Sequence, residues 1–489
     1  MKIVFIASEM APFAKTGGLA DVTGSLPREI RLLGHEVIAF VPRYKSVDPM
    51  SLGLEVAVER LRVPMGSEKE AARIYKTRLD SGVDCYFIDH PEFFCRDALY
   101  GTPLGDYPDN DRRFTFFQRA VLETLVYLGI KSDILHCHDW QTGLIPVYLK
   151  ILYKKTPLFQ KTKTIFTIHN LAYQGTFPPD SLAATGFGWE EFRMERLEFY
   201  GKISFLKGGI LDADTVTTVS ERYAREILTP EFGCGLEGVL SKRKDRLHGV
   251  VNGIDPQEWD PEIDEDLAEN YSLKRPSGKT TNKIDLQKEN GLNPDVKIPL
   301  LGMVTRLADQ KGMDIFIPAI SALLEMGAQI VLLGTGEEKY HQMLRDIAKK
   351  NKGKIAVHIL FDSKMAKRIY GGSDMMLFPS YYEPCGLGQM IALRFGTIPV
   401  VRATGGLADT IQEFDGTRRL GNGFLFEDYT SEALGAACRR ALSLFRAPEL
   451  WNDLIQNAMQ CDFSWAASAK KYVKIYELTK RQATEGSEK

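Results

Sequence analysis

The chain has 489 residues and a net charge of −2, from 62 lysines and arginines against 64 aspartates and glutamates. This near balance excludes binding of nucleic acid or of an anionic membrane by bulk positive charge, and the length predicts two or three domains. The seven cysteines are scattered, odd in number and contain no C-x-x-C pair, as is typical of a reducing compartment. No apolar run is long enough to cross a membrane, so we expect a cytoplasmic protein that binds neither nucleic acid nor membrane.

Short and nearly continuous apolar runs recur between helical patterns along the chain. Such runs are typical of strands that are buried on both faces of a parallel sheet. Their alternation with helices predicts an α/β protein with two doubly wound, Rossmann-like domains, whose ligands bind beyond the carboxyl ends of the strands. The runs lie at residues 3–7, 37–41, 85–88, 134–137, 164–168, 215–219 and 248–251 in the first half, and at 300–304, 330–333, 356–360, 375–378 and 398–401 in the second half.

Changes in composition predict the domain boundaries. We expect an N-terminal Rossmann-like domain at residues 1–259 and a C-terminal one at residues 260–461. Residues 260–295 are polar and are interpreted as an inter-domain connection with a short helix near residues 284–289. Within residues 462–489, we expect an amphipathic helix at residues 462–480 and a disordered tail at residues 483–489.

The hexapeptide Thr-Gly-Gly-Leu-Ala-Asp occurs twice, at residues 16–21 and 404–409, each time after an apolar run and before a helical pattern. A Gly-Gly pair lets the backbone turn tightly and expose bare N–H groups, and the following helix adds a positive dipole end. Two such clamps for an anion or a sugar hydroxyl, one in each half, favour a ligand held between two similar domains. The alternative is a pair of ordinary strand-to-helix turns. Lys15, just before the first copy, is a further phosphate signal unless it is simply solvated.

A histidine cluster, His136-Cys137-His138-Asp139-Trp140, follows another strand-like run. His138 with Asp139 is typical of a general base or of a hydrogen-bonded pair, and a structural histidine is the alternative. We expect strand alternation to point His136 and His138 to opposite faces of the sheet, which argues against a metal site here.

Arg306 and Lys311 share the segment that follows the apolar run at residues 300–304. Two fixed cations near the start of a helix can hold a diphosphate and stabilise the charge that grows on it as it leaves. The alternative is a pair of solvated surface cations, which is the usual environment of arginine and lysine.

Two more polar strings follow strand-like runs. Asn170, within residues 167–175, suits either a hydroxyl-rich ligand or the cap of a turn. Glu383, within residues 382–388, is a lone carboxylate beside two glycines. It can bind sugar hydroxyls or stabilise an oxocarbenium-like centre, and a first-turn glutamate that stabilises a helix dipole is the alternative.

Taken in order, these segments resemble the bacterial glycogen synthases and plant starch synthases. The resemblance covers nearly the whole chain, from Lys2 to about Leu478, and no single short string decides it. It rests on Lys15–Val22, His138–Trp140, Thr167–Gly175, Asn252–Asp255, Arg306 with Lys311, Glu383–Leu387, Thr404–Asp409 and Asp462–Trp465.

The resemblance implies the GT-B fold, with two Rossmann-like doubly wound parallel-sheet domains facing across a cleft and a tail helix crossing back to the N-terminal domain. The acceptor side is then the N-terminal domain and the nucleotide-sugar side the C-terminal one. The implied reaction is retaining transfer of glucose from ADP-glucose to the non-reducing end of an α-1,4-glucan, in glycogen biosynthesis, without a metal or cofactor. A GT-B transferase that uses UDP-glucose or another acceptor stays open, as does a catalytically silent glucan-binding protein.

The resemblance also implies roles for individual residues, with two departures from the family pattern. Ile391 stands where related transferases often carry a second glutamate, and Gly388 stands where many family members have threonine. We therefore expect no ribose-binding carboxylate at the first position and no hydroxyl assistance to the phosphate at the second. The implied catalytic residues are Glu383, His138, Arg306 and Lys311, and the implied substrate-binding residues are Lys15, Gly17, Gly18, Asp21, Tyr100, Asp109, Asn170, Asn252, Cys385, Gly386, Leu387, Thr404, Gly405 and Gly406.

Overall fold

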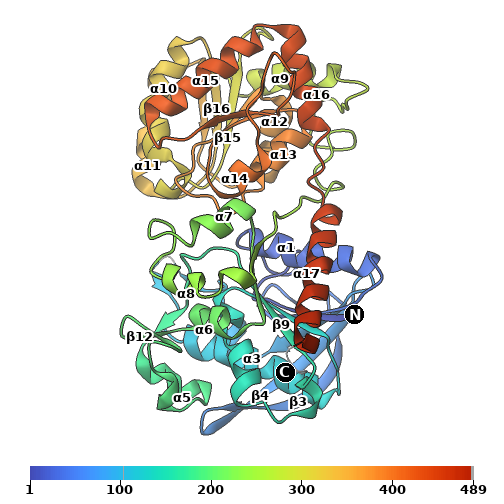
Figure 1. Cartoon of the computed structure of the whole chain (residues 1–489). Coiled ribbons are helices and arrows are strands. Elements are labelled where there is room, and N and C mark those ends of the chain that lie inside the picture. Colours follow the sequence, from blue (N-terminus) through green and yellow to red (C-terminus); the bar gives the residue numbers. More distant parts are fainter. Residues whose placement is uncertain (103, 486–489) are drawn as a thin grey trace. The chain divides into compact units, whose positions relative to one another are not determined.

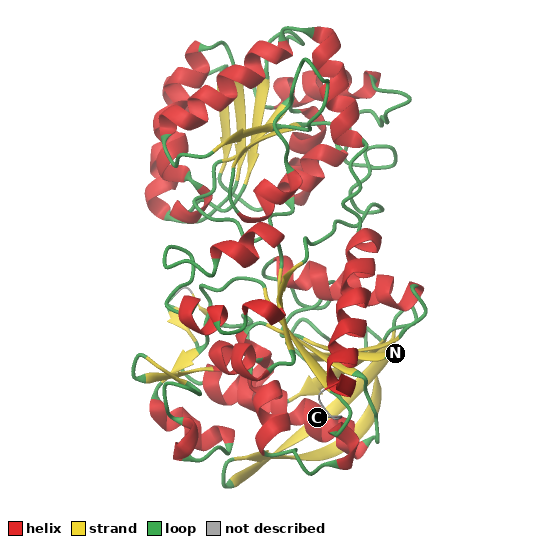
Figure 2. Cartoon of the chain, viewed as in Figure 1, coloured by secondary structure: helices red, strands yellow, loops and turns green. Residues whose placement is uncertain are grey.

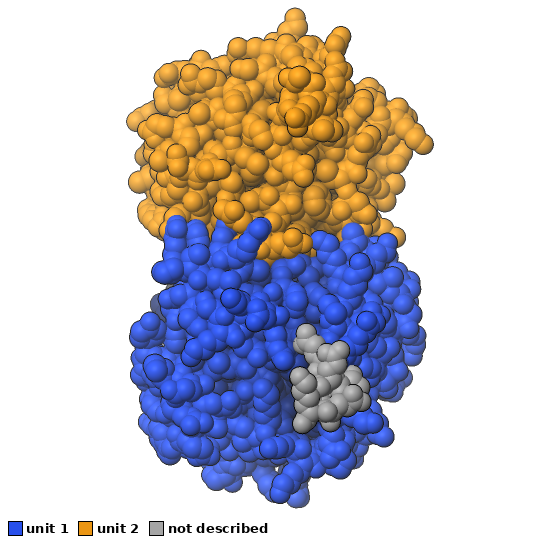
Figure 3. All heavy atoms as spheres, viewed as in Figure 1, with its two compact units in different colours: residues 1–219, 224–250, 465–489 blue, residues 220–223, 251–464 orange. Residues whose placement is uncertain are grey.

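The structure, a computed structural model, describes residues 1–102 and 104–485. The chain divides into two compact units, drawn in two colours in Figure 3. Unit 1 comprises Met1–Val219, Ala224–Val250 and the segment from Trp465, and unit 2 comprises Ser220–Tyr223 and Val251–Ser464. The boundary expected after residue 259 falls inside unit 2, and as a functional division it stays a prediction.

Unit 1 is built on a nine-stranded sheet in the order β14-β13-β9-β8-β1-β2-β5-β4-β3. All neighbours pair in parallel except β3 with β4 and β4 with β5. The apolar runs of the first half all fall on strands of this sheet, but the long hairpin β3–β4 was not expected. Its strands expose about every second residue and therefore lack a continuous apolar run. The strands are β1 (Lys2–Ile6), β2 (Glu36–Pro42), β3 (Glu55–Met65), β4 (Glu68–Arg78), β5 (Asp84–Asp89), β8 (Ile134–His138), β9 (Lys163–Ile168), β13 (Thr215–Thr218) and β14 (Leu247–Gly249).

Helices and two small sheets complete unit 1 (Figure 1). The small sheets pair β6 (Gly101–Thr102) with β7 (Gly105–Asp106), and β12 (Lys202–Ser204) with both β10 (Thr176–Phe177) and β11 (Glu198–Phe199). The helices are α1 (Gly18–Leu32), α2 (Pro91–Phe94), α3 (Asn110–Tyr127), α4 (Leu144–Ile151), α5 (Leu182–Thr185), α6 (Phe205–Asp212), α8 (Glu237–Ser241) and α17 (Trp465–Glu485), with α7 (Glu221–Glu226) shared between the units.

The C-terminal helix α17 belongs to the core of unit 1. Trp465, Tyr472 and Tyr476 recur at helical spacing and pack with β1 and with α1 in one apolar cluster. The helix starts at Trp465, because residues 462–464 form a turn in which the N–H of Ser464 donates to Asp462 at 2.9 Å. It runs to Glu485, so the first part of the expected disordered tail is helical, and residues 486–489 lie outside the described residues.

Unit 2 is built on a six-stranded sheet, all parallel, in the order β17-β16-β15-β18-β19-β20 (Figure 2, strands in yellow). The apolar runs of the second half predict five of these strands, and only the three-residue β20 was not expected. The strands are β15 (Leu300–Val304), β16 (Gln329–Leu333), β17 (Ile355–His358), β18 (Met375–Phe378), β19 (Ile398–Arg402) and β20 (Phe424–Phe426).

Eight helices of unit 2 are described, and side-chain caps start two of them. Asp362 accepts the N–H groups of Lys364 and Met365, and Thr430 accepts the N–H of Ala433. The helices are α9 (Ser277–Glu289), α10 (Met313–Glu325), α11 (Glu338–Lys350), α12 (Ser363–Gly372), α13 (Gly388–Arg394), α14 (Gly405–Thr410), α15 (Ser431–Phe445) and α16 (Pro448–Met459). No helix among the described residues is long and apolar enough to cross a membrane.

The polar segment at residues 260–295 is part of unit 2, and its interpretation as a connection with a short helix is wrong. Its helix, α9, is 13 residues long and packs with α12. Four of its polar residues, Asp264, Asn282, Lys283 and Gln287, are buried. Their polar groups have partners inside the unit: Lys283 lies 2.7 Å from Asp374, and the Asn282 amide donates to two backbone carbonyls. Composition alone cannot distinguish a solvated polar segment from one whose polar groups are satisfied internally.

Both large sheets place the first strand of their unit in the middle. β1 lies between β8 and β2, and β15 lies between β16 and β18. The chain therefore changes direction of winding at β1 in unit 1 and at β15 in unit 2. Ligands of doubly wound sheets bind at the carboxyl ends of the strands at such a switch point.

Trp465→Ala tests the assignment of α17 to the core of unit 1. Trp465 is 3% exposed, so we expect the free energy of unfolding to fall by about 3–5 kcal/mol, measured by urea denaturation. Leu478→Ala on the same helix is the control, because Leu478 is 50% exposed and its truncation should cost less than about 1 kcal/mol. Equal effects of the two substitutions would contradict the assignment.

Candidate active site

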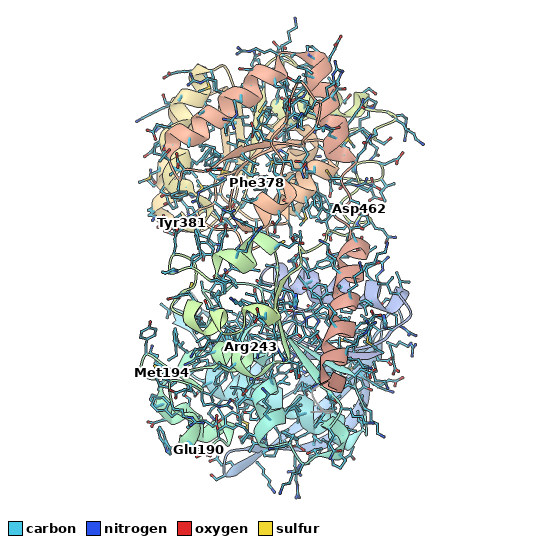
Figure 4. The ribbon with its side chains drawn as sticks, viewed as in Figure 1. Glu190, Met194, Arg243, Phe378, Tyr381 and Asp462 are labelled. Carbon is cyan, nitrogen blue, oxygen red and sulfur yellow. The ribbon has the colours of Figure 1, made fainter. Side chains whose placement is uncertain are left out.

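Two loops after neighbouring parallel strands form the first candidate site, on unit 2. β15 leads through Arg306 into a 3-10 turn, η6 (Asp309–Lys311), and β18 ends at Phe378 and leads into a loop that contains Tyr381 (Figure 4). Gln310 joins the loops, because its carbonyl oxygen accepts the N–H of Tyr381 at 2.9 Å. Within its own loop, the Gln310 side-chain oxygen accepts Arg306 Nη2 at 2.8 Å. The sheet thus brings Arg306 and the Tyr381 loop together across a wide separation in sequence.

Glu383 and Lys311 form an ion pair across these loops. Lys311 Nζ donates to Glu383 Oε2, and the Ser380 hydroxyl donates to the same oxygen at 3.1 Å. Glu383 is 8% exposed, and α13 begins only at Gly388, so Glu383 is not a first-turn glutamate of that helix. Lys311 is likewise not a solvated surface cation, whereas Arg306 is exposed.

The second hexapeptide supports the Glu383 loop. The N–H of Gly406 donates to the carbonyl oxygen of Glu383 at 3.1 Å, so the bare N–H expected there is occupied. A Cβ at Gly405 would lie 1.9 Å from that same carbonyl oxygen, and a Cβ at Gly406 would lie 2.1 Å from the carbonyl oxygen of Cys385. Gly405 also has a φ of 44°, which favours glycine. Thr404, the residue before α14, is buried.

The other predicted residues of unit 2 lie around this loop. The backbone N–H of Asn252 bonds to the sulfur of Cys385, and burial raises the pKa of the Cys385 thiol to about 12. The Asn252 side-chain oxygen is buried without a hydrogen-bond partner among the described residues, which is a position where a ligand or water is needed. Gly386, with a φ of 72°, and Leu387 lead into α13.

A groove of about 890 Å³ adjoins the same loops on unit 2. Its tyrosines come from three separate segments, so no local sequence pattern marks them. Its lining is mostly apolar with a few charged groups, as is typical of small-molecule sites. The lining residues are Asp309, Gln310, Met313, Asp314, Ile317, Pro318, Lys339, Tyr340, Met343, Tyr381, Tyr382 and Tyr429.

The second candidate site lies at the end of β1 in unit 1, where Glu9 organises the first hexapeptide. One carboxylate oxygen accepts the hydroxyls of Thr16 and Tyr100 at 2.6 and 2.7 Å. The other accepts the backbone N–H groups of Thr16 and Gly17 at 2.5 and 3.3 Å. The expectation of bare N–H groups is therefore wrong for Thr16 and Gly17. Glu9 itself was not predicted, although its place directly after a buried strand is a usable signal.

The glycines of the first hexapeptide face open space, unlike those of the second. No atom lies within 4 Å of a Cβ built on Gly17 or Gly18, so packing does not demand glycine at either position. Lys15 pairs with Asp21 of the same hexapeptide at 2.6 Å, and its side chain is 52% exposed. The first copy thus presents an accessible cation beside a loop with free space around it.

His136 and His138 lie on the same face of the sheet, so the expectation of opposite faces is wrong. Their ring centroids are 4.2 Å apart. The reason is the period of two in a strand, which returns residues i and i+2 to one face. Among the described residues, no group of three histidine, cysteine, aspartate or glutamate side chains has the geometry of a metal site.

His138 pairs with His169 and not with Asp139. His138 Nδ1 lies 3.0 Å from His169 Nε2, and the Asp139 carboxylate accepts the backbone N–H of His169 at 2.7 Å. Burial lowers the pKa of His138 well below its usual value and that of His169 to about 3, and it raises the pKa of Asp139 to about 7. Both imidazoles are therefore neutral at pH 7, and the Asp139 carboxylate bonds to the backbone of His169 and not to its ring.

Three other predicted residues of unit 1 are engaged in local structure. Tyr100 bonds to Glu9 and to the Ser8 hydroxyl, both at 2.7 Å. Asp109 forms a bidentate pair with Arg96 at 2.8 and 2.5 Å. Asn170 accepts the N–H of Ala172 at 3.0 Å, which is the turn cap that the sequence analysis left open.

Two Rossmann-like units, each with polar groups at the switch point of a parallel sheet, define a protein of the GT-B glycosyltransferase class. Comparison with protein families agrees. The family described as starch synthase catalytic domain matches residues 2–242, and the one described as glycosyl transferases group 1 matches residues 285–460. The sucrose-phosphate synthase of Thermosynechococcus elongatus, at 15% identity, a TM-score of 0.59 and 99% coverage of both chains, shows the same fold.

Closer relatives define the family. The glycogen synthase of Geotalea uraniireducens is 48% identical over 98% of this chain and 99% of that protein, and glycogen synthase 2 of Geobacter sulfurreducens is 46% identical with the same coverage. The catalytic domain of starch synthase IV from Arabidopsis thaliana, bound to ADP and acarbose, matches with a TM-score of 0.89 and 35% identity over 98% of this chain and 99% of that one. The chain belongs to the glycogen and starch synthase family, and it is an enzyme of glucosyl transfer in glycogen synthesis.

Gly405→Ala tests whether the second hexapeptide supports the Glu383 loop. The added methyl group has no space beside the Glu383 carbonyl, so we expect a loss of about 1–3 kcal/mol in the free energy of unfolding together with a loss of activity. Gly18→Ala is the matched control for stability, because the same methyl group meets open space there. Thermal unfolding of both variants gives the comparison, and equal stability would show that close packing does not explain the second copy.

Proposed function

We propose that this enzyme transfers glucose, with retention of configuration, from ADP-glucose to the 4-hydroxyl at the non-reducing end of an α-1,4-glucan. The observation that carries the proposal is the partly buried Lys311–Glu383 pair at the switch point of unit 2, with Arg306 on the same loop. ADP and acarbose in the related Arabidopsis structure support a nucleotide donor and a glucan acceptor. The seven free cysteines support the cytoplasmic location that we propose with it.

The chemistry of this pair fits departure of a nucleoside diphosphate. Negative charge grows on the distal phosphate as its bond to the sugar breaks, and fixed cations stabilise that charge most where water is excluded. Lys311 is held in place by Glu383, and Arg306 is accessible one turn away on the same loop. Because these cations supply the positive charge, the proposal includes no metal and no cofactor besides the donor.

Glu383 is a poor candidate for a nucleophile that forms a covalent sugar intermediate. One of its oxygens already accepts both Lys311 and Ser380, and an ion-paired carboxylate is a weaker nucleophile than a free one. We therefore propose that the acceptor hydroxyl attacks on the same face from which the diphosphate leaves. Trapping a covalent glucosyl adduct on Glu383 by mass spectrometry would refute this part of the proposal.

Unit 1 then supplies groups for sugar hydroxyls and for the diphosphate. His138 and His169 are neutral hydrogen-bonding groups, which suit uncharged hydroxyls. Lys15 is exposed beside two glycines that leave open space, which suits the phosphates of the donor. We propose that Lys15 exchanges its contact with Asp21 for the donor phosphate.

Incorporation of glucose into a glycogen primer, measured in parallel from ADP-glucose and UDP-glucose with a chelator present, tests the function. We expect strong incorporation from ADP-glucose without added metal. Preference for UDP-glucose would keep the reaction and overturn the proposed donor. No incorporation from either donor would favour another acceptor or a silent glucan-binding protein.

Lys311→Ala is expected to lower kcat by about 10²- to 10³-fold, because it removes the fixed charge that stabilises the leaving phosphate. Lys367→Ala is the matched control, since Lys367 is a lysine of unit 2 that pairs with Asp264 at 3.1 Å and is about as exposed as Lys311, but lies outside the candidate site. Steady-state rates with saturating donor and glycogen give the comparison. A normal kcat for the Lys311 variant would mean that Lys311 takes no part in the chemistry.

Lys15→Gln is expected to raise KM for ADP-glucose by roughly tenfold with a much smaller change in kcat, because a phosphate contact made before and during the reaction contributes uniform binding. Lys45→Gln, which removes an exposed lysine paired with Asp97, is the control. Initial rates over a range of donor concentrations separate the two constants. An effect on kcat alone would contradict a donor-binding role.

A further inference from the structure

His136 is buried in the core of unit 1 with both ring nitrogens engaged. Its Nδ1 lies 2.9 Å from the hydroxyl of Tyr476 on α17, and its Nε2 lies 2.7 Å from the hydroxyl of Thr167 on β9. Thr167 bonds in turn to the Thr217 hydroxyl at 2.6 Å. Because the two ring nitrogens bond to partners on opposite sides, the His136 ring cannot rotate without breaking a hydrogen bond.

His138 is held mainly by its neighbours and by one hydrogen bond. Its ring lies 4.2 Å from the His136 ring and 5.6 Å from the Phe5 ring, which it stacks at an interplanar angle of 15°. Nδ1 bonds to His169 at 3.0 Å, whereas Nε2 is buried and has no hydrogen-bond partner among the described residues. The orientation of the His138 ring therefore depends on the ring of His136 beside it.

We propose that Tyr476 is a positioning residue that acts through His136 on His138. The Tyr476 hydroxyl fixes His136, and the fixed His136 ring holds His138 so that its free Nε2 keeps one direction. A C-terminal helix thereby sets the geometry of a site residue at the end of β8. The inference rests on the proposed function, in which His138 bonds to sugar hydroxyls.

The positioning depends on the hydroxyl of Tyr476, because this group bonds to His136 Nδ1. Tyr472, one turn earlier on α17, also contacts His136, with ring centroids 5.5 Å apart. Both nitrogens of His136 are already engaged by Tyr476 and Thr167, so the Tyr472 hydroxyl does not bond to that ring. Tyr472→Phe is thus a matched control that removes one hydroxyl from the same buried helix face.

The test is a double-mutant cycle between Tyr476→Phe and His138→Asn, with Tyr472→Phe as control. We expect Tyr476→Phe to lower kcat for glucose incorporation about tenfold, since small displacements of a positioned group cost at least this much, and Tyr472→Phe to leave kcat nearly unchanged. In the His138→Asn background, Tyr476→Phe should cause no further loss, because a residue that acts through another is non-additive with it. Thermal unfolding of each variant measures stability separately.

Three results would overturn the inference: a normal kcat for Tyr476→Phe, the same loss for Tyr472→Phe, or a full further loss in the His138→Asn background. A wild-type enzyme that transfers no glucose would instead refute the proposed function. The positioning is then still tested by ¹⁵N NMR of the histidine rings, where the His138 signals should shift in Tyr476→Phe and not in Tyr472→Phe. Unchanged His138 signals in both variants would also overturn the inference.

Discussion

The contact between the loops after β15 and β18 determines the site in unit 2. The Lys311–Glu383 pair is nearly buried, and burying two charges costs more than their attraction returns unless the geometry is good and further hydrogen bonds are made. A further hydrogen bond to the pair comes from Ser380, and the bond from the Tyr381 N–H to the Gln310 carbonyl joins the two loops. The pairing of β15 with β18 places the two loops side by side at the carboxyl ends of the strands. The Gly405–Gly406 turn packs against the carbonyl of Glu383 and bonds to it.

The repeated hexapeptide shows that the same six residues can have two different structural roles. In the first copy, Glu9 takes up the N–H groups while the glycines face open space. In the second copy, the glycines are required because two carbonyl oxygens approach within the reach of a Cβ. The identical sequences predicted two related turns, but the residues that each turn contacts come from other parts of the chain: Glu9 for the first copy, and Glu383 and Cys385 for the second. Only the fold reveals that Gly406 supports Glu383.

The sequence predicts best what depends on local pattern and least what depends on distant partners. Continuous apolar runs predicted the buried parallel strands, whereas the hairpin β3–β4, exposed on one face, has no such run. The polar segment that contains Lys283 was interpreted as an inter-domain connection, because the partners of its buried polar residues lie far along the chain. The roles assigned to site residues stay predictions, yet the structure pairs Lys311 with Glu383 and places Arg306 on the same loop as Lys311. That His136 and His138 share one face was predictable, because residues i and i+2 of a strand point to the same side of the sheet. Our expectation of opposite faces misapplied this rule.

The electrostatics of the two units argue for catalysis over simple binding of glucan. A neutral oligosaccharide is recognised by hydroxyl, amide and imidazole groups, which unit 1 provides through His138 and His169. A protein that only held glucan would gain little from a lysine and a glutamate paired largely out of water, since nothing would offset the cost of desolvating them. The pair becomes useful when a charge develops during a reaction, because preorganised charges then stabilise it without rearrangement. In the proposed function, neutral imidazoles for sugar hydroxyls and the cations Lys15, Arg306 and Lys311 for phosphate match a reaction that joins an uncharged acceptor to a phosphorylated donor.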